Sequence, residues 1–234
     1  MAQDQHFMVD KELLKEVVEA ADPLPTDEIL EIGAGHGELT QFLARKAYVI
    51  AVELDSELVK SFPALESITL VEGNALKLWW SKVFNKVVGN IPYTISEPLV
   101  WLILKKPLER VTLVVGKDFA EILLSDSKLG ILTREFYKVE VLKVIPKKAF
   151  FPQPRVDSAL VLMKPKALSN PVLRELVWQS DKKIKNALEK AWEGQLAKKE
   201  VKEKLKELGE ITNRKITQLS NEEFDELFKL LNKL

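Results

Sequence analysis

The sequence predicts a doubly wound α/β domain built on a mostly parallel sheet, followed by a small all-helical domain. Short β-branched runs alternate with helical patterns, the first five of these runs are apolar almost throughout, and such runs nearly vanish after Pro165. Continuous apolar runs are typical of parallel strands covered on both faces. Strand–helix alternation implies right-handed crossovers. We therefore expect one domain over residues 1–168 and a second over residues 169–234.

The elements of the first domain follow from these patterns in chain order. A helix is expected over 10–21 with Asp10 as its N-cap. Seven strands are expected at 28–32, 48–53, 68–72, 86–89, 111–115, 138–145 and 158–163, with helices at 39–46, 56–62 and 98–105. The last two strands are separated only by the proline-rich segment 146–157 and should run antiparallel to their neighbours. Five parallel strands with a closing hairpin match the common methyltransferase fold and not a six-stranded dinucleotide fold.

The second domain is expected to be helical to its end. Asn170-Pro171 is typical of a helix start, with proline at the first helical position. Ser220-Asn-Glu-Glu223 predicts a capping box for the last helix. The apolar stripe of that helix is expected to consist of Phe224, Leu227, Phe228, Leu230 and Leu231.

Composition limits the classes of function. The chain of 234 residues has no cysteine and two histidines, which excludes disulfides, thiolate zinc sites and cysteine nucleophiles, so we expect no metal. It has no apolar stretch long enough for a membrane span and no signal-peptide pattern, so we expect a cytoplasmic protein. Net charge is zero, but residues 182–206 hold nine basic and four acidic side chains. This run suits either a polyanionic partner or a solvated helix face.

A glycine-rich turn directly after the first strand predicts a cofactor site. Gly33-Ala-Gly35-His-Gly37 lets the backbone turn sharply and approach a ligand. Glu53 ends the second strand, where a carboxylate can accept the hydroxyls of a ribose. These features alone fit NAD and S-adenosylmethionine about equally, or a tight turn that binds nothing. The G-x-G-x-G spacing and Glu31 before the loop favour the cationic cofactor, and Asn74 is placed to meet its adenine.

The segment Asn90-Ile91-Pro92-Tyr93 after the fourth strand predicts chemistry on a base amine. The lone pair of an exocyclic amine is delocalised into the ring, so acceptors aimed at its N–H groups favour the attacking form. The Asn90 side-chain oxygen and the Ile91 carbonyl are our candidates for these acceptors. Pro92 fixes the turn, and Tyr93 offers a flat face on which an extruded base can stack.

Four motifs together resemble those of a known family. They are Gln5-His-Phe-Met-Val-Asp10, Glu31-Ile-Gly-Ala-Gly-His-Gly-Glu-Leu-Thr40, Val88-Gly-Asn-Ile-Pro-Tyr-Thr-Ile-Ser96 and Phe150-Phe-Pro-Gln-Pro-Arg-Val-Asp-Ser158. In order and spacing they resemble the KsgA/Dim-type small-subunit rRNA adenine dimethyltransferases, which are related to the Erm enzymes. The resemblance covers residue 5 to about residue 165. It implies a class I S-adenosylmethionine-dependent methyltransferase fold.

The resemblance also implies a reaction and a set of site residues. The reaction is transfer of two methyl groups to N6 of each of two adjacent adenosines in a hairpin near the 3′ end of small-subunit rRNA. The implied cofactor site consists of Gln5, His6, Met8, Gly33, Gly35, Glu53, Leu54, Asn74, Ala75 and Asn90. The implied target-base site consists of Asn90, Ile91, Pro92, Tyr93 and Phe150, with Phe150 stacking on the base from the face opposite Tyr93. Asn74 stands where the family usually has aspartate, and the C-terminal domain is short for the family.

Other functions remain open at this point. An Erm-like enzyme would modify large-subunit rRNA, and a ribosome-assembly factor would use methylation only secondarily. A DNA adenine methyltransferase is less favoured, because those enzymes usually carry proline at the position of Ile91 and need a recognition domain. We expect the substrate to be small-subunit rRNA or a partly assembled small subunit. We also expect the C-terminal domain to contact it and the protein to act as a monomer.

Overall fold

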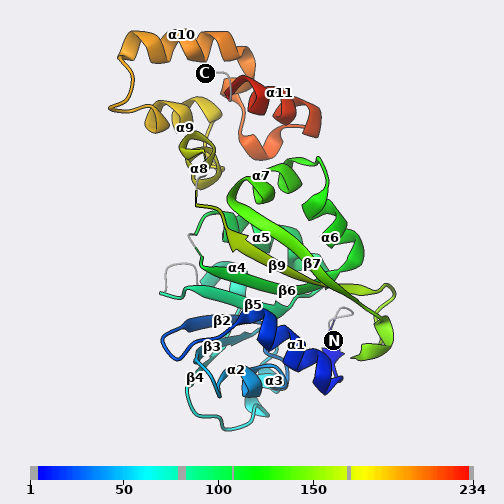
Figure 1. The fold of residues 1–234 in the computed structure, drawn as a ribbon. Coiled ribbons are helices and arrows are strands. Elements are labelled where there is room, and N and C mark those ends of the chain that lie inside the picture. Colours follow the sequence, from blue (N-terminus) through cyan, green and yellow to red (C-terminus); the bar gives the residue numbers. More distant parts are fainter. Residues whose placement is uncertain (1–4, 79–82, 107, 168–169, 232–234) are drawn as a thin grey trace. The chain divides into compact units, whose positions relative to one another are not determined.

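The computed structural model describes residues 5–78, 83–106, 108–167 and 170–231 (Figure 1). The chain forms two compact units. The first consists of Met1–Ile122 and Tyr137–Pro165, and the second of Leu123–Phe136 and Lys166–Leu234. The division predicted between residues 168 and 169 falls on two residues outside the described ranges. It also differs from the observed division, because residues 123–136 group with the C-terminal helices.

The first unit is built on a seven-stranded sheet. Its strands are β2 (Glu28–Ile32), β3 (Tyr48–Glu53), β4 (Ile68–Glu72), β5 (Lys86–Asn90), β6 (Arg110–Gly116), β7 (Tyr137–Ile145) and β9 (Ser158–Pro165). Their order is β4-β3-β2-β5-β6-β9-β7. Strands β2 to β6 are parallel to one another, and β9 runs antiparallel to both β6 and β7. The predicted methyltransferase sheet with its closing hairpin is confirmed.

The strand order explains where a ligand can bind. From β2 the chain proceeds to β3 in one direction along the sheet, whereas from β5 it proceeds to β6 in the opposite direction. Because the crossovers are right-handed, helices that connect strands in the first direction lie on one face of the sheet, and helices that connect strands in the second direction lie on the other face. These helices are α2 (Thr40–Leu43), α3 (Ser56–Lys60), α4 (Ala75–Leu78) and α5 (Ser96–Leu104). The strand order reverses between β2 and β5, and in such sheets the crevice at the carboxyl ends of these strands is where ligands bind.

An apolar core lies between the sheet and α1 (Lys11–Ala21). The predicted N-cap is observed, because the Asp10 carboxylate accepts hydrogen bonds from the backbone N–H groups of Glu12 and Leu13. The helix packs against β6 and β9 through its buried residues, which are Leu13, Leu14, Val17, Val18 and Ala21. Among the described residues, no helix is both long enough and apolar enough to cross a bilayer.

The predicted helix bounds differ from the structure for local reasons. The helix expected over 56–62 ends at Lys60, since Pro63 disfavours helical geometry at the residue before it. The helix expected over 98–105 begins at Ser96, since a proline in the first turn costs no intrahelical hydrogen bond. The helix expected over 39–46 is only Thr40–Leu43. Three α-helices of the described residues before Pro165 were not predicted, namely α4, α6 (Lys117–Leu124) and α7 (Lys128–Phe136).

A two-stranded ribbon that was also not predicted joins the N-terminus to residues near 150. Strand β1 (Phe7–Met8) pairs antiparallel with β8 (Phe150–Phe151). A short 3₁₀ helix, Lys147–Ala149, precedes β8. The ring nitrogen Nδ1 of His6 lies 2.8 Å from the carbonyl oxygen of Pro152, which makes a further hydrogen bond between the two segments. The ribbon therefore holds the first described residues beside the crevice.

A buried ion pair lies at the opposite, amino-terminal edge of the sheet. Lys86 Nζ is 2.6 Å from Asp27 Oδ2, and these side chains are 5% and 3% exposed. Asp27 also accepts hydrogen bonds from the Asn85 amide and the Leu24 backbone N–H, and Lys86 donates to the carbonyl of Asp22. Each charge is therefore paired and hydrogen-bonded, which is the condition under which buried charges are tolerated.

The second unit is helical, as predicted. It contains α7 together with α8 (Pro171–Trp178), α9 (Ile184–Ala191), α10 (Lys198–Leu208) and α11 (Asn221–Leu231), and the 3₁₀ turns Gly209–Asn213 and Ile216–Gln218. The Lys128 N–H donates to the Asn221 side chain, which ties α7 to α11. The predicted capping box at Ser220 and Glu223 is observed. In the predicted stripe of α11, Leu230 is the exception, because it is 42% exposed.

Candidate functional site

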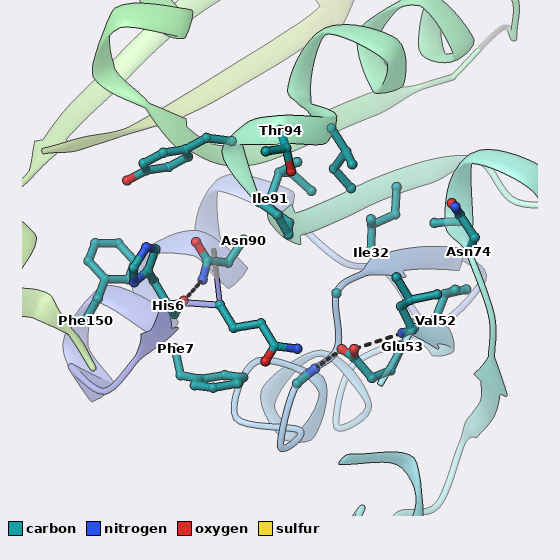
Figure 2. A pocket seen from close by; sticks show the side chains of 18 of the residues that line it. His6, Phe7, Ile32, Val52, Glu53, Asn74, Asn90, Ile91, Thr94 and Phe150 are labelled. Atoms are coloured by element: carbon teal, nitrogen blue, oxygen red, sulfur yellow. Dashed lines mark hydrogen bonds between the residues drawn. The ribbon is translucent and has the colours of Figure 1, made fainter. Parts of the chain in front are cut away.

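A cavity of about 220 Å³ lies at the carboxyl ends of β2, β3, β4 and β5 (Figure 2). Every predicted site residue except Met8 lines it: Gln5, His6, Gly33, Gly35, Glu53, Leu54, Asn74, Ala75, Asn90, Ile91, Pro92, Tyr93 and Phe150. Figure 2 shows Glu53 and Asn74 on one side of the cavity and His6 and Phe150 on the other. The topology thus brings together residues that are far apart in the sequence.

The structure does not bring Met8 to this cavity. Successive side chains of a strand point to opposite faces, and in β1 the cavity is lined by Phe7. Met8 is 4% exposed and lies in the apolar core. Phe7 was not predicted as a site residue, because the alternation applies to a two-residue strand that the sequence does not reveal.

Phe7 packs against the glycine loop at Gly35. A Cβ atom on Gly35 would lie 3.1 Å from the Phe7 ring, and the backbone φ of Gly35 is +59°. Both the left-handed backbone and the lack of space therefore require glycine here. The Phe7 ring also contacts His36, with ring centroids 4.7 Å apart. Apart from this contact His36 is exposed, so the Phe7 ring touches it on the solvent-facing side of the loop.

Glu53 connects the glycine loop to the end of β3. Its carboxylate is buried, and Oε2 accepts a hydrogen bond of 2.8 Å from the Gly35 N–H. Oε1 accepts from the N–H groups of Leu54 and Asp55 at 2.8 and 2.9 Å. A carboxylate offers roughly four acceptor directions, so most are used by the backbone. The remaining direction is available to a ligand hydroxyl, and a second hydroxyl would compete with the Gly35 N–H.

Glu31 lies beneath the glycine loop and does not line the cavity. It is 1% exposed, and its Oε2 has no hydrogen-bond partner among the described residues. Burial raises the pKa of Glu31 to about 8, and the nearby carboxylates of Glu38 and Glu53 act in the same direction. The nearby Thr40 hydroxyl acts in the opposite direction. Burial therefore disfavours the negative charge on which the sequence argument for a cationic cofactor relied.

Asn90 is oriented by the N-terminal segment. Its side-chain Nδ2 donates a hydrogen bond of 2.7 Å to the carbonyl oxygen of His6. This bond fixes which end of the amide is the donor, so the oxygen Oδ1 remains an acceptor. In Figure 2 the amide oxygen faces the side of the cavity where the rings of His6 and Phe150 lie. The acceptor predicted from the sequence is thus presented toward an aromatic space.

Tyr93 and Phe150 line this aromatic space from different elements. The Tyr93 hydroxyl and the Ser158 hydroxyl are 2.9 Å apart and share a hydrogen bond. The Tyr93 ring centroid lies 6.2 Å from that of His6. Phe150 is only 3% exposed, so it offers the cavity a part of its ring and packs the remainder in the core. Ser158 was not predicted as a site residue, since a strand-initial serine has no distinctive pattern.

Comparison with known proteins decides the family. A family model described as ribosomal RNA adenine dimethylase matches residues 2–233. The chain belongs to this family. The enzyme class predicted from the motifs, an rRNA adenine dimethyltransferase, is thereby confirmed.

Relatives of this ribosomal RNA adenine dimethylase include a probable ribosomal RNA small subunit methyltransferase A from Pyrococcus abyssi. It is 32% identical, and the alignment covers 97% of this chain and 90% of the relative. Among solved structures, a dimethyladenosine transferase from Plasmodium falciparum is similar with a TM-score of 0.68 and 26% identity, covering 97% and 98% of the two chains. The 23S rRNA methyltransferase ErmE is similar with a TM-score of 0.66 and 26% identity, covering 97% and 99%. The TM-scores and identities therefore do not distinguish between these two structures.

Proposed function

We propose that this ribosomal RNA adenine dimethylase methylates N6 of two adjacent adenosines in the 3′-terminal hairpin of small-subunit rRNA, with S-adenosylmethionine as cofactor. The supporting observation is the Asn90 amide, which the His6 carbonyl holds with its oxygen toward an aromatic-lined cavity. The relative from Pyrococcus abyssi is named for the small subunit and is similar over nearly its whole length. This favours small-subunit rRNA over the large-subunit substrate named for ErmE.

The residues at the carboxyl ends of β3 and β4 fit S-adenosylmethionine. Glu53 would accept a ribose hydroxyl, and Gly33 and Gly35 line the cavity beside it, where the methionine portion would lie. Asn74 Oδ1 already accepts a hydrogen bond of 2.9 Å from the Leu76 N–H. Its amide NH₂ remains a donor at the cavity wall, which would suit a ring nitrogen of adenine. Bound S-adenosylmethionine supplies an electrophilic methyl group on a sulfonium centre, and no metal is needed for that chemistry.

The target adenine would occupy the aromatic side of the cavity. Asn90 Oδ1 and the Ile91 carbonyl would accept the two N6–H groups, which favours a pyramidal nitrogen whose lone pair is free to attack. The Ile91 N–H donates to the Val114 carbonyl at 2.8 Å, and this bond fixes the peptide that follows Asn90. Tyr93 and Phe150 would stack on the base. As the new N–C bond forms, the bond between the methyl group and the sulfonium sulfur would break, and S-adenosylhomocysteine would leave as a neutral thioether. The nitrogen would then be cationic and would lose its proton to water without a dedicated base.

Replacing Glu53 with alanine is expected to weaken S-adenosylmethionine binding by about 1.5–3 kcal/mol, the usual contribution of hydrogen bonds to a charged group. The loss has two origins, because the variant removes the ribose acceptor and also frees the Gly35 N–H. Calorimetric titration measures it. Glu72→Ala is the matched control. Glu72 lies opposite Glu53 in the register of β3 and β4, but Glu72 is exposed. Saturable NAD binding to the wild-type protein would contradict the cofactor assignment.

The proposed reaction is tested by incubating the protein and labelled S-adenosylmethionine with unmethylated small and large ribosomal subunits, naked rRNA and DNA. Mass spectrometry then maps the methylated nucleotides. We expect dimethyladenosine at two adjacent positions in the small subunit. Methylation confined to the large subunit would support an Erm-like enzyme. Tight binding to the small subunit without methylation would support an assembly factor.

We propose further that the second unit contacts rRNA phosphates and that the protein acts as a cytoplasmic monomer on ribosomal particles. The exposed lysines of the run 182–206 are Lys182, Lys183, Lys190, Lys198, Lys199, Lys202 and Lys206. Lys199 lies 4.0 Å from Glu203, and such an exposed pair contributes little to stability. Contacts between these lysines and phosphates would make particle binding weaken as salt is raised.

A further inference from the structure

An exposed aromatic ring beside the site has no role in the function proposed so far. Phe151 is 72% exposed, compared with 49% for Trp178 and 41% for Tyr48. Its neighbour Phe150 is buried and lines the cavity. Since adjacent residues of β8 point to opposite faces, the same short strand presents one ring to the cavity and the other to solvent.

The segment that carries Phe151 is anchored at several points. The Lys147 N–H donates to the Asp157 carboxylate at 2.9 Å, and the Val9 N–H donates to the Ala149 carbonyl at 3.0 Å. His6 is hydrogen-bonded to the Pro152 carbonyl on the other side of Phe151. The ring is therefore held in place without being covered. An apolar ring kept exposed on a fixed support forgoes the stabilisation of burial, which marks it as a candidate contact surface.

The surroundings of the ring indicate the chemistry of its partner. Lys147, Lys148 and Arg155 lie in the same segment, and all three are exposed. Among the described residues, no ion pair engages any of them. The nearest acid in sequence, Asp157, already accepts the Lys147 backbone N–H. An aromatic ring interleaved with uncompensated cations suits single-stranded nucleic acid, which offers base faces and phosphates together, better than it suits an apolar protein surface.

We propose that Phe151 stacks on the nucleotide next to the flipped adenine, with Lys147, Lys148 and Arg155 contacting the flanking phosphates. The inference rests on the proposed function. When one of two adjacent adenosines leaves the stack, its neighbour loses a stacking partner, and unstacking has a cost that the enzyme must offset. Phe151 replaces the lost partner just outside the cavity that receives the flipped base.

The experiment compares Phe151→Ala, Phe151→Leu and Phe151→Trp with wild type. Binding is measured with a fluorescent RNA hairpin that contains two adjacent adenosines, and with small ribosomal subunits by filtration. Removing one base–aromatic stack is expected to weaken binding about 5- to 150-fold. We expect this loss for alanine and leucine, binding close to wild type for tryptophan, and unchanged S-adenosylmethionine affinity for all three. Tyr48→Ala is the control, because Tyr48 is an exposed aromatic residue at the amino end of β3, away from the cavity.

The outcomes separate this inference from the proposed function. If the wild type methylates the small subunit but Phe151→Ala binds RNA as well as the wild type does, the stacking role is overturned and the function stands. If the wild type transfers no methyl group but its RNA binding depends on an aromatic residue at 151, the function fails and the stacking role stands. Leucine binding as well as tryptophan would overturn stacking. The stacking role would also be overturned if the only effect of Phe151→Ala were a loss of self-association, measured by sedimentation.

Discussion

Replacing Asn90 with alanine is expected to slow methyl transfer roughly 30- to 1,000-fold, which corresponds to about 2–4 kcal/mol of transition-state stabilisation. The variant removes the acceptor that the Asn90 oxygen offers to the amine of the base. Because this interaction strengthens as the nitrogen becomes cationic, the loss should fall on the transfer step and leave S-adenosylmethionine binding largely intact. Single-turnover kinetics and calorimetry measure the two quantities separately.

A second variant distinguishes the acceptor from its support. Asn90→Asp keeps an acceptor oxygen at this position but replaces the Nδ2 group that donates to the His6 carbonyl at 2.7 Å with a second oxygen. If the acceptor alone matters, aspartate should restore part of the rate. If the bond to His6 matters more, aspartate should be as slow as alanine. Normal transfer by Asn90→Ala would refute the role that we assign to this residue.

Replacing Asp27 with alanine is expected to destabilise the protein by about 3–5 kcal/mol, because it leaves the Lys86 ammonium buried without its counter-charge. The two groups are 2.6 Å apart and at most 5% exposed. Urea unfolding measures the effect. Glu57→Ala is the matched control, since Glu57 pairs with Lys60 at the same short distance of 2.7 Å but on the surface. That exposed pair is expected to contribute at most about 1 kcal/mol.

The pair of Asp27 and Lys86 should also make the stability of the protein depend on pH in the acidic range. Burial by itself raises the pKa of Asp27, but the hydrogen bonds from Lys86, Asn85 and the Leu24 backbone outweigh it, so the pKa lies below its ordinary value of 3.8. A carboxyl whose pKa is lowered on folding stabilises the protein above its unfolded pKa. That stabilisation is lost as the pH falls through the lower, folded value. We therefore expect the free energy of unfolding of the wild type to fall below about pH 4. In Asp27→Asn the part of this fall that comes from protonation of Asp27 should be missing. An identical acid dependence in the two proteins would contradict the assignment.

The main sheet could be predicted from the sequence because its signal is local. The bounds predicted for β2, β3 and β4 match the structure, since each strand is a mostly apolar run bounded by polar or turn residues. The ribbon of β1 and β8 could not be predicted. A strand of two residues has no periodicity, and its pairing depends on segments that only the folded chain brings together.

The site residues show the same limit. The conformation and spacing of Gly33, Gly35 and Asn90 follow from short motifs, and the structure places all three at the cavity. That Phe7 and not Met8 faces the cavity depends on the ribbon of β1 and β8. The raised pKa of Glu31 depends on its complete burial by several elements. Neither property resides in a local pattern. A sequence supplies the chemical groups of the site, whereas tertiary packing decides their direction and charge.

The β1–β8 ribbon has a consequence for when the protein becomes active. The hydrogen bond between His6 and Pro152 joins residues 146 positions apart, and the bond that orients Asn90 spans 84 positions. During synthesis the N-terminal residues emerge first, and contacts across long separations form late because loop closure must come before them. The Asn90 amide is therefore aligned only after residues near 152 have left the ribosome. We therefore expect a nascent chain that lacks the residues near 152 to transfer no methyl group.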